Sequence, residues 1–560
     1  MAINYSKLFN LRKSRTPQSQ AIAGSTQVAN NAGGFAWAVD DWMRLDRFLI
    51  LGAEGGTYYV GERDLIKQNH DALVRCIQAD GARVVKRITE VSDKGLAPKN
   101  DPAIFALALA AAHGDAATKK LALESLPKVC RIGTHLFHFG EYVNALRGWG
   151  RGLRRAVADW YVAKNAPQLA LQAVKYQQRD GWSHRDMLRL AHPRAKNVSQ
   201  DAVFRWMVGG TEALGARRVA RRKLCESQYG ELSAHLPPLI AAFEEAKLAS
   251  TNRLVELIVE HDLPREAVPT EKLKEIAVWE ALLEKMPMTA MIRNLGKMTN
   301  IGLVKPLSAA SKKIVSTLND ESALKRARAH PLAVLLANKI YAQGRGDKGK
   351  LAWKPVQTVV DALDGAFYAT FQNVEPCGKP MVLALDVSGS MTCANVAGSC
   401  LTAREGSAAL ALITAATESD YVIVGFSAAA GGYGGQWGGG ESGLTPINIS
   451  PRMRLAEVIK RIEAIPMGGT DCALPMVWAR RNRVHTSAFV TYTDSETWAG
   501  KIHPSEALRD YRSQFVADSR MIVVGMASNG FSIADPNDRW SLDVVGFDAS
   551  VPAVIADFIR

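Results

Sequence analysis

The stretch 381-MVLALDVSGSM-391 decides the fold of the C-terminal part of the chain. Its apolar run predicts a buried strand, and the run ends in one carboxylate and two hydroxyls. Similar runs follow it, separated by helical stretches. The predicted strands are 381–388, 421–427, 487–494 and 520–528, and the predicted helices between them include 396–419 and 452–465. Short apolar strands that alternate with helices indicate an open, largely parallel sheet with helices on both faces, a Rossmann-like α/β domain.

Polar residues gather at the expected carboxyl-terminal edge of this sheet, where open α/β folds bind their ligands. The motif D-x-S-x-S ends the first strand, and two later loops, 466-PMGGTDC-472 and 491-TYTDSET-497, add a threonine and an aspartate. Oxygen donors of this kind suit a hard divalent cation, and Mg²⁺ is the one we expect. The predicted cation ligands are Asp386, Ser388, Ser390, Thr470 and Asp494.

The order of D-x-S-x-S, T and D resembles the metal-ion-dependent adhesion site of a von Willebrand factor A domain. The alternative is an Asp- and Ser-rich turn that only caps the following helix, and three contributing loops in the right order argue against it. No general base or nucleophile accompanies the predicted ligands in the sequence. We therefore expect a ligand-binding or structural cation site, with no catalytic residues and no enzyme activity.

Length and composition indicate a multidomain globular protein. A chain of 560 residues is too long for one compact core. It has no apolar run long enough to predict a membrane span, and its start, MAINYSKLFNLRKSRTPQSQ, lacks the apolar core of a secretory signal. The 7 cysteines include no CxxC pair, which argues against a zinc knuckle and a disulfide framework. We expect the protein in a reducing cytoplasm, away from membranes.

The charge is divided unevenly along the chain. Residues 1–370 contain 54 Lys and Arg against 36 Asp and Glu, a net of +18. Residues 371–560 contain 15 against 19, a net of −4, and the two values sum to the +14 of the whole chain. A basic part of this size indicates a polyanionic partner, most often nucleic acid, although a solvated basic surface would show the same charge.

The basic part has helical periodicity. Residues 354–371 repeat their apolar positions as a helix does, and Asp101 is expected to start a helix that Gly114 ends, with Asp115 capping the next one. Short helices joined by tight turns favour an α-solenoid of antiparallel helix pairs. The predicted domains are an N-terminal lead-in at 1–30, a helical domain at 31–370, a linker at 371–380 and an α/β domain at 381–560.

The segment 147–196 has the densest positive charge. Lys175 and Arg179 are four residues apart, which predicts one helix face, and Arg185, Arg189 and His192 follow at i, i+4 and i+7 of the next predicted helix. That helix is expected to begin at a capping signal from Ser183 and Asp186 and to end before Pro193. A second cluster lies in 216-ARRVARRK-223. The predicted RNA-binding residues are Lys175, Arg179, Arg185, Arg189, His192, Arg217, Arg218, Arg221 and Arg222.

Aromatic residues are interleaved with these charges. Cations placed for phosphates, with aromatic rings nearby for unstacked bases, are the surface that single-stranded or looped RNA requires. The alternatives are a solvated face for the cations and a core position for the rings. The aromatic residues of the segment are Trp149, Trp160, Tyr161, Tyr176 and Trp182.

Several longer segments resemble the Ro autoantigen family, whose members carry a TROVE domain. These segments include 47-RFLILGAEGGTYYV-60, 129-VCRIGTHLFHF-139, 175-KYQQRDGWSHRDMLRLAH-192, 286-MPMTAMIRNLGKMT-299, 466-PMGGTDCALPMVWA-479 and 525-GMASNGFSIADPNDR-539. The resemblance extends from about residue 30 to the end of the chain. The insertion 428-AAAGGYGGQWGGGESG-443 has no counterpart in it, and its glycines predict a mobile loop.

The resemblance implies a monomeric ring of HEAT-like helical repeats closed by a von Willebrand A domain, with a basic central hole. It implies binding of small noncoding Y RNAs on the outer surface, through Lys175, Arg179 and His192, and of single-stranded ends of misfolded RNAs through the hole. It also implies association with exoribonucleases such as polynucleotide phosphorylase in rRNA maturation and RNA decay. The five predicted cation ligands match the family's cation site.

Two other functions stay open at the level of sequence. A cation-dependent adhesion or scaffolding protein would bind protein ligands through the α/β domain, and the positive charge of the helical domain would then be incidental. A nuclease would use the predicted cation, but the sequence offers it no general base beside the cation ligands. RNA that co-purifies with the protein would favour the RNA-binding function over the scaffold, and a lack of RNA cleavage with Mg²⁺ would exclude the nuclease.

Overall fold

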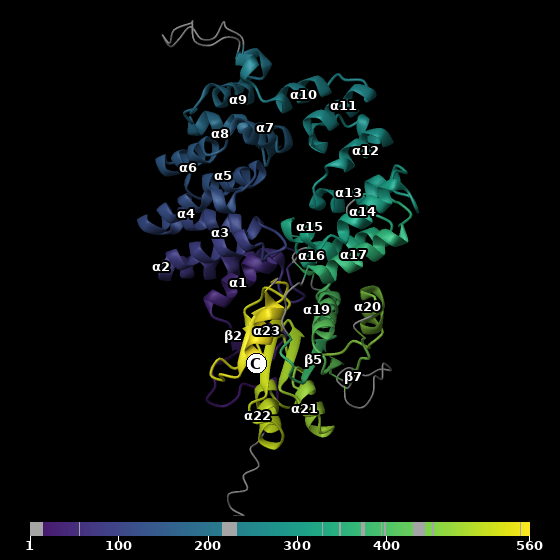
Figure 1. Cartoon of the computed structure of the whole chain (residues 1–560). Coiled ribbons are helices and arrows are strands. Elements are labelled where there is room, and N and C mark those ends of the chain that lie inside the picture. Colours follow the sequence, from purple (N-terminus) through teal and green to yellow (C-terminus); the bar gives the residue numbers. More distant parts are fainter. Residues whose placement is uncertain are drawn as a thin grey trace, which may run out of the picture. The chain divides into compact units, whose positions relative to one another are not determined.

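The chain is described by a computed structural model (Figure 1) over residues 15–54, 56–214, 232–327, 329–346, 349–370, 376–393, 395–396, 399–428, 443–450, 453–548 and 550–560. It divides into two compact units. The helical unit consists of residues 74–95 and 99–370, and the α/β unit consists of residues up to 73, residues 96–98 and the residues from 371 onward. The predicted combination of a helical part with an α/β part is therefore confirmed.

The helical unit is built from helices of mostly two to four turns. They are α2 (Glu62–Lys94), whose first part belongs to the α/β unit, α3 (Asp101–His113), α4 (Ala116–Val129), α5 (Gly133–Arg147), α6 (Arg151–Val162), α7 (Ala166–Lys175), α8 (His184–Ala191), α9 (Val198–Gly209), α10 (Pro238–Ala246), α11 (Thr251–His261), α12 (Ile276–Glu284), α13 (Met288–Asn300), α14 (Ala309–Leu318), α15 (Glu321–Arg326), α16 (Pro331–Ala342) and α17 (Gln357–Ala369).

Local signals set the ends of these helices. Asp101 begins α3, Gly114 is its C-cap, and the side chain of Asp115 accepts a hydrogen bond of 2.8 Å from the backbone N–H of Thr118 to cap α4, as predicted. The helix predicted over 354–371 is observed as α17, over Gln357–Ala369. It begins later than expected because Val356 has extended backbone angles.

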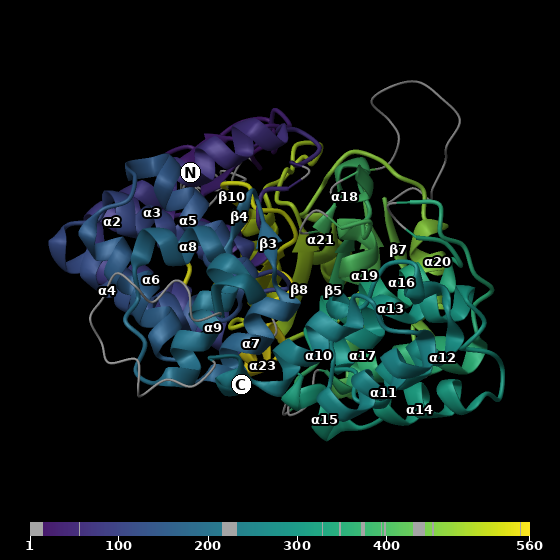
Figure 2. The same ribbon diagram turned by 90° about the horizontal axis from the view of Figure 1, so that it is seen from above.

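Neighbouring helices pack in the order of the sequence, which is the packing of a solenoid. Helix α3 contacts α4 and α5, α4 contacts α6, and α6 contacts α8. Figures 1 and 2 both show α3 to α9 side by side. Because these contacts join helices that are one or two places apart in the sequence, their buried faces pack together along the stack.

The α/β unit contains a six-stranded sheet of order β11-β9-β8-β5-β6-β7, in which every neighbouring pair is parallel except β6 and β7. Its strands are β5 (Met381–Asp386), β6 (Tyr421–Phe426), β7 (Leu444–Pro446), β8 (Ala488–Thr493), β9 (Arg520–Gly525) and β11 (Ser541–Val545). All six residues of β5 are buried, as expected for a central parallel strand. The predicted parallel sheet is confirmed.

Helices flank this sheet, and Figure 1 shows α19 beside β5. They are α18 (Gly389–Cys393), α19 (Ala403–Thr417), α20 (Leu455–Glu463), α21 (Leu474–Arg481), α22 (Pro504–Gln514) and α23 (Val551–Ile559). The prediction of one helix over 396–419 was wrong at its start. Thr402 and Glu405 form a capping box, so the helix begins only at Ala403.

The N-terminal segment belongs to the α/β unit and differs from the loosely ordered lead-in that its composition predicted. Strands β1 (Gln27–Ala29) and β2 (Phe35–Ala38) form an antiparallel sheet with β10 (Phe531–Ser532). Helix α1 (Asp41–Leu51) follows, and its fully buried Arg47 donates two hydrogen bonds, of 2.8 and 2.9 Å, to the carboxylate of Asp543.

Contacts within each unit divide the chain at about residue 74. The first half of the predicted linker at 371–380 and most of the glycine-rich insertion at 428–443 lie outside the described residues. Among the helices that the structure describes, none combines the length and the apolar character needed to span a bilayer.

Candidate cation site and nucleic-acid interface

The candidate cation site begins at the carboxyl ends of two neighbouring parallel strands. Asp386 ends β5 and Thr493 ends β8, so both residues reach the same edge of the sheet. The Oδ1 atom of Asp386 accepts a hydrogen bond of 2.9 Å from the backbone N–H of Ser388, and its Oδ2 atom accepts one of 2.6 Å from the hydroxyl of Thr493. The carboxylate is therefore held from both strands.

The other predicted ligands join Asp386 from three loops. The hydroxyl oxygens of Ser388 and Ser390 are 3.2 Å apart, and Ser390 also hydrogen-bonds the carboxylate of Asp494. The backbone carbonyl of Thr470 accepts hydrogen bonds from the N–H groups of the two residues after Thr497, at 3.1 and 3.0 Å. All five predicted ligands are buried, at 0 to 3% exposure. The structure therefore brings the predicted set to one edge of the sheet.

Burial dominates the electrostatics of this edge. Burial, and to a smaller extent the nearby negative charge of Asp494, together raise the pKa of Asp386 to about 7. Burial also raises the pKa of the Asp494 carboxyl, against the effect of the hydrogen bond from Ser390. Two buried carboxylates beside each other are stabilised in their charged forms by a bound cation.

The donor set fits a hard divalent cation. It consists of carboxylate and hydroxyl oxygens, the ligands that Mg²⁺ takes in proteins, with no sulfur or imidazole among the five predicted residues. In the described part of the chain, no group of three or more His, Cys, Asp and Glu side chains is arranged to hold a metal ion, and the candidate site combines two carboxylates with hydroxyl oxygens. The five residues Asp386, Ser388, Ser390, Thr470 and Asp494 would hold the ion.

Two further residues of this edge, Thr493 and Glu496, were not predicted from the sequence. Thr493 donates to Asp386, and Glu496 lies two residues after Asp494 with its side chain buried. Burial, with a contribution from Asp494, raises the pKa of Glu496 to about 7. Both residues occur in the quoted 491-TYTDSET-497, but the partner of Glu496 is Asn31, 465 positions away, and no local pattern connects them.

Five of the nine predicted RNA-binding residues, Lys175, Arg179, Arg185, Arg189 and His192, lie in or next to a short hairpin. Helix α7 ends at Lys175, and strands β3 (Gln178–Arg179) and β4 (Trp182–Ser183) follow, joined by Asp180 and Gly181. The prediction that Lys175 and Arg179 share a helix face was wrong. An Asp-Gly pair with both φ angles positive, 53° and 78°, makes a tight two-residue turn that a helix cannot contain.

Helix α8 carries the next predicted residues. The capping box predicted from Ser183 and Asp186 is present, and the helix ends before Pro193 as predicted. Arg185 and Arg189 are exposed one turn apart on α8. His192 is exposed too, but it is the C-cap with a left-handed φ of 49°, so the predicted continuation of the helix face to His192 was wrong.

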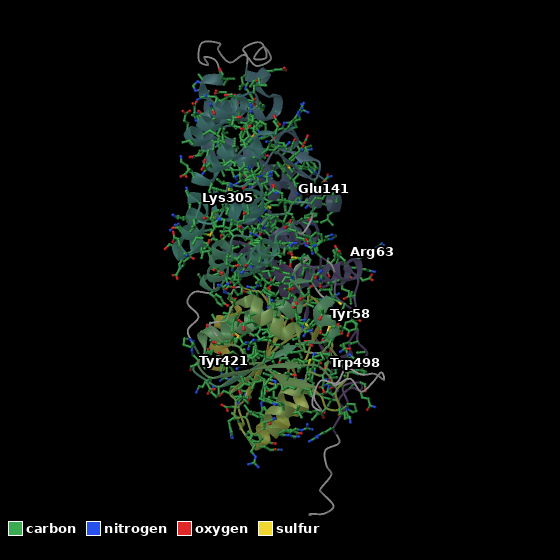
Figure 3. The ribbon with its side chains drawn as sticks, turned by 90° about the vertical axis from the view of Figure 1, so that its right-hand side faces the viewer. Tyr58, Arg63, Glu141, Lys305, Tyr421 and Trp498 are labelled. Carbon is green, nitrogen blue, oxygen red and sulfur yellow. The ribbon has the colours of Figure 1, made fainter. Side chains whose placement is uncertain are left out.

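The hairpin is fixed to the helices beneath it. The indole N–H of Trp182 donates a hydrogen bond of 2.6 Å to Glu141 of α5, a residue labelled in Figure 3, and the ring of Trp182 lies 5.6 Å from that of Trp149. Asp180 forms an ion pair with His138, and Arg179 pairs with Asp180 at 3.5 Å. These contacts hold the exposed Arg179 beside the end of α7.

The remaining predicted residues divide into core and undescribed positions. Trp160 and Tyr161 are fully buried, and Trp160 donates a hydrogen bond of 2.6 Å to the carbonyl of Cys130, so both are core residues of the stack. Tyr176 is half-buried, with the ammonium of Lys175 5.5 Å from its ring centre. Arg217, Arg218, Arg221 and Arg222 lie outside the described residues.

Comparison with known proteins finds relatives along almost the whole chain. The model of the TROVE domain matches residues 28–237 and 257–340, and the model of the Ro60 vWA domain matches residues 380–559. A curated protein of Deinococcus radiodurans named RNA-binding protein RO60 is 41% identical over 547 residues, which are 97% of this chain and 97% of that protein. One of Caenorhabditis elegans with the same name is 35% identical over 607 residues, covering 97% and 92%.

A solved structure is similar as well. The crystal structure of the Ro (RSR) protein of Deinococcus radiodurans covers 93% of this chain and 99% of its own, with 40% sequence identity and a TM-score of 0.67. The fold is therefore shared with this structure over 93% of the chain.

Proposed function

We propose that this chain binds a Y-like small noncoding RNA and the single-stranded 3′ ends of misfolded or immature structured RNAs. The chain belongs to the Ro60 family of RNA-binding proteins, which have a TROVE domain and a von Willebrand A domain. RNA is its partner in general, as for its relatives. The finer proposal includes closure of the helical repeats into a monomeric ring by the α/β unit, with single strands passing through a basic hole.

The observation that supports the Y-like RNA most directly is the basic surface at the hairpin. Arg179, Arg185, Arg189 and His192 are all exposed, and Lys175 lies at the end of α7 just before them. Exposed cations on a rigid helical scaffold contact phosphates without rearrangement of the protein. The net charge of +18 over residues 1–370 adds long-range attraction for the same polyanion.

The first experiment removes two of these cations. Lys175→Ala combined with Arg179→Ala should weaken binding of the small RNA that co-purifies with the parent protein at least tenfold, since each charged hydrogen bond to phosphate contributes about 1.5–3 kcal/mol. Gel shifts measure the affinity, and circular dichroism should show an unchanged fold. The matched control, Lys94→Ala with Lys120→Ala, removes the same charge from α2 and α4. Equal affinities for the two double variants would reject this RNA surface.

We also propose a role in RNA quality control, in which the protein passes bound RNA to an exoribonuclease such as polynucleotide phosphorylase in the cytoplasm. The chain itself is then no enzyme. RNA incubated with the purified protein and Mg²⁺ should stay intact, and the exoribonuclease should be recovered with the protein from host extract. Cleavage that the Asp386→Ala variant abolishes would show a nuclease instead.

The α/β unit is proposed to bind a divalent cation, Mg²⁺ above others, through Asp386, Ser388, Ser390, Thr470 and Asp494. The convergence of their three loops at one buried edge supports this. Isothermal titration calorimetry with Mg²⁺ should detect one site per chain in the parent protein and none in Asp386→Ala. Binding that survives this substitution would place the ion elsewhere.

A scaffolding function is the second candidate, because two exposed aromatic residues belong to the α/β unit. Tyr58 is 56% exposed and Trp498 is 40% exposed, and Figure 3 shows both on one side of that unit. Exposed large rings of this kind anchor protein partners. A protein purified without RNA, with an absorbance ratio at 260 and 280 nm typical of protein alone, would favour this function.

A further inference from the structure

The N-terminal segment, residues 16–34, lies against two of the loops that carry the proposed cation ligands. Gln18 is fully buried, although a glutamine in a polar, Ser- and Thr-rich sequence would be expected at the surface. The backbone N–H of Gln18 donates to the carbonyl of Gly500 at 2.9 Å, and the N–H of Phe35 donates to the carbonyl of Gln18 at 2.8 Å. The backbone of Gln18 therefore bonds to Gly500 on one side and to Phe35, the first residue of β2, on the other.

The side chain of Gln18 connects the second ligand loop to the third. Its amide N–H₂ donates hydrogen bonds of 2.8 Å to the carboxylate of Asp471, the residue after Thr470, and of 2.8 Å to the carbonyl of Ile502. Its amide oxygen accepts hydrogen bonds from the hydroxyl of Thr497 and from the N–H of Gly500. One buried amide therefore satisfies polar groups of both loops.

Two asparagines hold the residues next to the ligand Asp494. Asn31 donates to both oxygens of the Glu496 carboxylate, through its backbone N–H at 2.9 Å and its side-chain amide at 2.8 Å. Asn30 donates from its side chain to the carbonyl of Thr497 at 2.8 Å. The backbone N–H of Glu496 in turn donates to the Oδ1 atom of Asp494 at 3.1 Å. A chain of hydrogen bonds runs from Asn31 to the cation ligand.

Close packing shows that this contact is specific. A Cβ atom on Gly34 would lie 1.9 Å from the carbonyl oxygen of Thr497, so only glycine permits the approach of the two backbones. On the other side, the amide of Asn529 donates to the carbonyl of Asp494 at 2.6 Å and to Glu496 at 3.2 Å. Asn529 lies just before β10, the strand that pairs with β2 of the N-terminal segment.

We propose that the N-terminal segment sets the cation affinity of the α/β unit, with Gln18 and Asn31 as positioning residues for the loop that carries Asp494. The inference rests on the proposed cation site and deepens it. Residues that orient metal ligands through hydrogen bonds typically contribute 10- to 100-fold to metal affinity. Asn31→Ala removes the amide donor to the Oε1 atom of Glu496 and leaves the backbone donor to Oε2, so the carboxylate is held by one hydrogen bond fewer and can turn toward Asp494, whose position then varies.

The experiment uses the full chain and titrates it with Mg²⁺ and with Mn²⁺ by isothermal titration calorimetry. Asn31→Ala should weaken binding of both ions at least tenfold, and Asn31→Asp should weaken it further, because a second carboxylate then faces Glu496. The matched control is Gln20→Ala, an exposed side chain of the same segment, which should bind like the parent. Asp386→Ala should abolish binding.

The outcomes separate the two proposals. If the parent binds neither ion, the cation site itself is rejected and the positioning role falls with it. If the parent binds and Asn31→Ala binds with the same affinity, only the positioning role is overturned. Circular dichroism and RNA gel shifts of Asn31→Ala should match the parent. A variant that has lost its fold would overturn the inference too, since Asn31 would then have a structural role.

Discussion

Buried charge has its clearest consequence at Asp386. Its pKa is raised to about 7 in the folded chain, mainly by burial, from an ordinary value near 4. The folded state therefore binds a proton more tightly than the unfolded state. In the absence of a divalent cation, the stabilisation is complete below about pH 4 and is lost as pH rises toward 7. A bound cation favours the carboxylate and reverses this dependence.

We therefore predict that Mg²⁺ raises the unfolding temperature of the α/β unit by a few degrees near pH 8 and by much less near pH 5. Differential scanning calorimetry with Mg²⁺ and with a chelator measures the difference. Asp386→Asn, which keeps the shape of the side chain but cannot ionise, should remove both the effect of Mg²⁺ and the loss of stability with rising pH. An equal effect of Mg²⁺ at the two pH values would contradict the prediction.

His184 gives the helical unit the opposite dependence. Its side chain is buried, with Nδ1 2.7 Å from the hydroxyl of Tyr161, and burial lowers its pKa to about 4. The unfolded chain takes up the proton first as pH falls, because its histidine keeps a pKa near 6.5. Stability is therefore complete above about pH 6.5 and is lost as pH falls toward 4.

The measurable result is faster native-state hydrogen exchange in α6 and α8 at pH 5 than at pH 7, after correction for the intrinsic rates. The variant His235→Gln, which changes an exposed histidine of the same unit, should show the same increase as the parent. Unchanged protection of α8 between the two pH values would show that His184 is not held in its neutral form.

Among the elements, the hairpin of β3 and β4 carries Arg179, one of the proposed RNA contacts. Gly181 has a φ of 78°, and a side chain there would meet no atom within 4 Å. A valine at this position therefore costs only backbone strain, about 1–2 kcal/mol. Because the turn must change its angles to relieve that strain, Arg179 should move away from its place beside α7.

We predict that Gly181→Val lowers the affinity for the co-purifying RNA about fivefold or more, as measured by fluorescence anisotropy. Gly210→Val is the matched control, since Gly210 also has a positive φ, of 66°, and open space around it, at the end of α9. Both variants should lose thermal stability, and Gly210→Val should lose at least as much, because its φ of 66° with a ψ of −161° is a region that essentially only glycine adopts. The prediction fails if the control loses as much RNA affinity as Gly181→Val.

At the scale of the whole molecule, we expect the separation of charge along the chain to favour RNA binding by its basic part. The basic residues are concentrated before residue 371, and residues 371–560 have a net charge of −4. Phosphate contacts release counterions, so the logarithm of the affinity should fall linearly with the logarithm of the salt concentration. We predict a steep slope for the parent, reduced by about 1 for each phosphate contact removed.

The double variant Lys175→Ala with Arg179→Ala should thus show a smaller slope than the parent over a salt series, while Asp386→Ala keeps the slope of the parent. A slope that the double variant leaves unchanged would mean that neither side chain contacts phosphate. The series distinguishes lost phosphate contacts from a general weakening, which would lower the affinity at every salt concentration without changing the slope.

Local sequence patterns alone predicted which helices and strands make up much of the two units. The mostly apolar runs before Asp386 and Asp494 identify β5 and β8, because a strand buried on both faces is largely apolar. The capping residues Asp115 and Ser183 identify the starts of α4 and α8, since a helix start depends on a few neighbouring residues. The D-x-S-x-S motif contains three of the five proposed ligands. The other two were predicted from later loops, because the carboxyl ends of neighbouring parallel strands lie at one edge of the sheet.

Only the tertiary structure decided where the N-terminal segment belongs. Its strands pair with β10, and Asn31 bonds to Glu496, across separations of more than 460 residues that leave no periodic signal in either segment. The hairpin after Lys175 was also not predicted. The spacing of Lys175 and Arg179 suggested a helix, but the tight turn at Asp180 and Gly181 gives a hairpin instead. Short-range steric preferences are written into neighbouring residues, whereas a hydrogen bond between distant segments exists only once the folded chain has brought its two partners together.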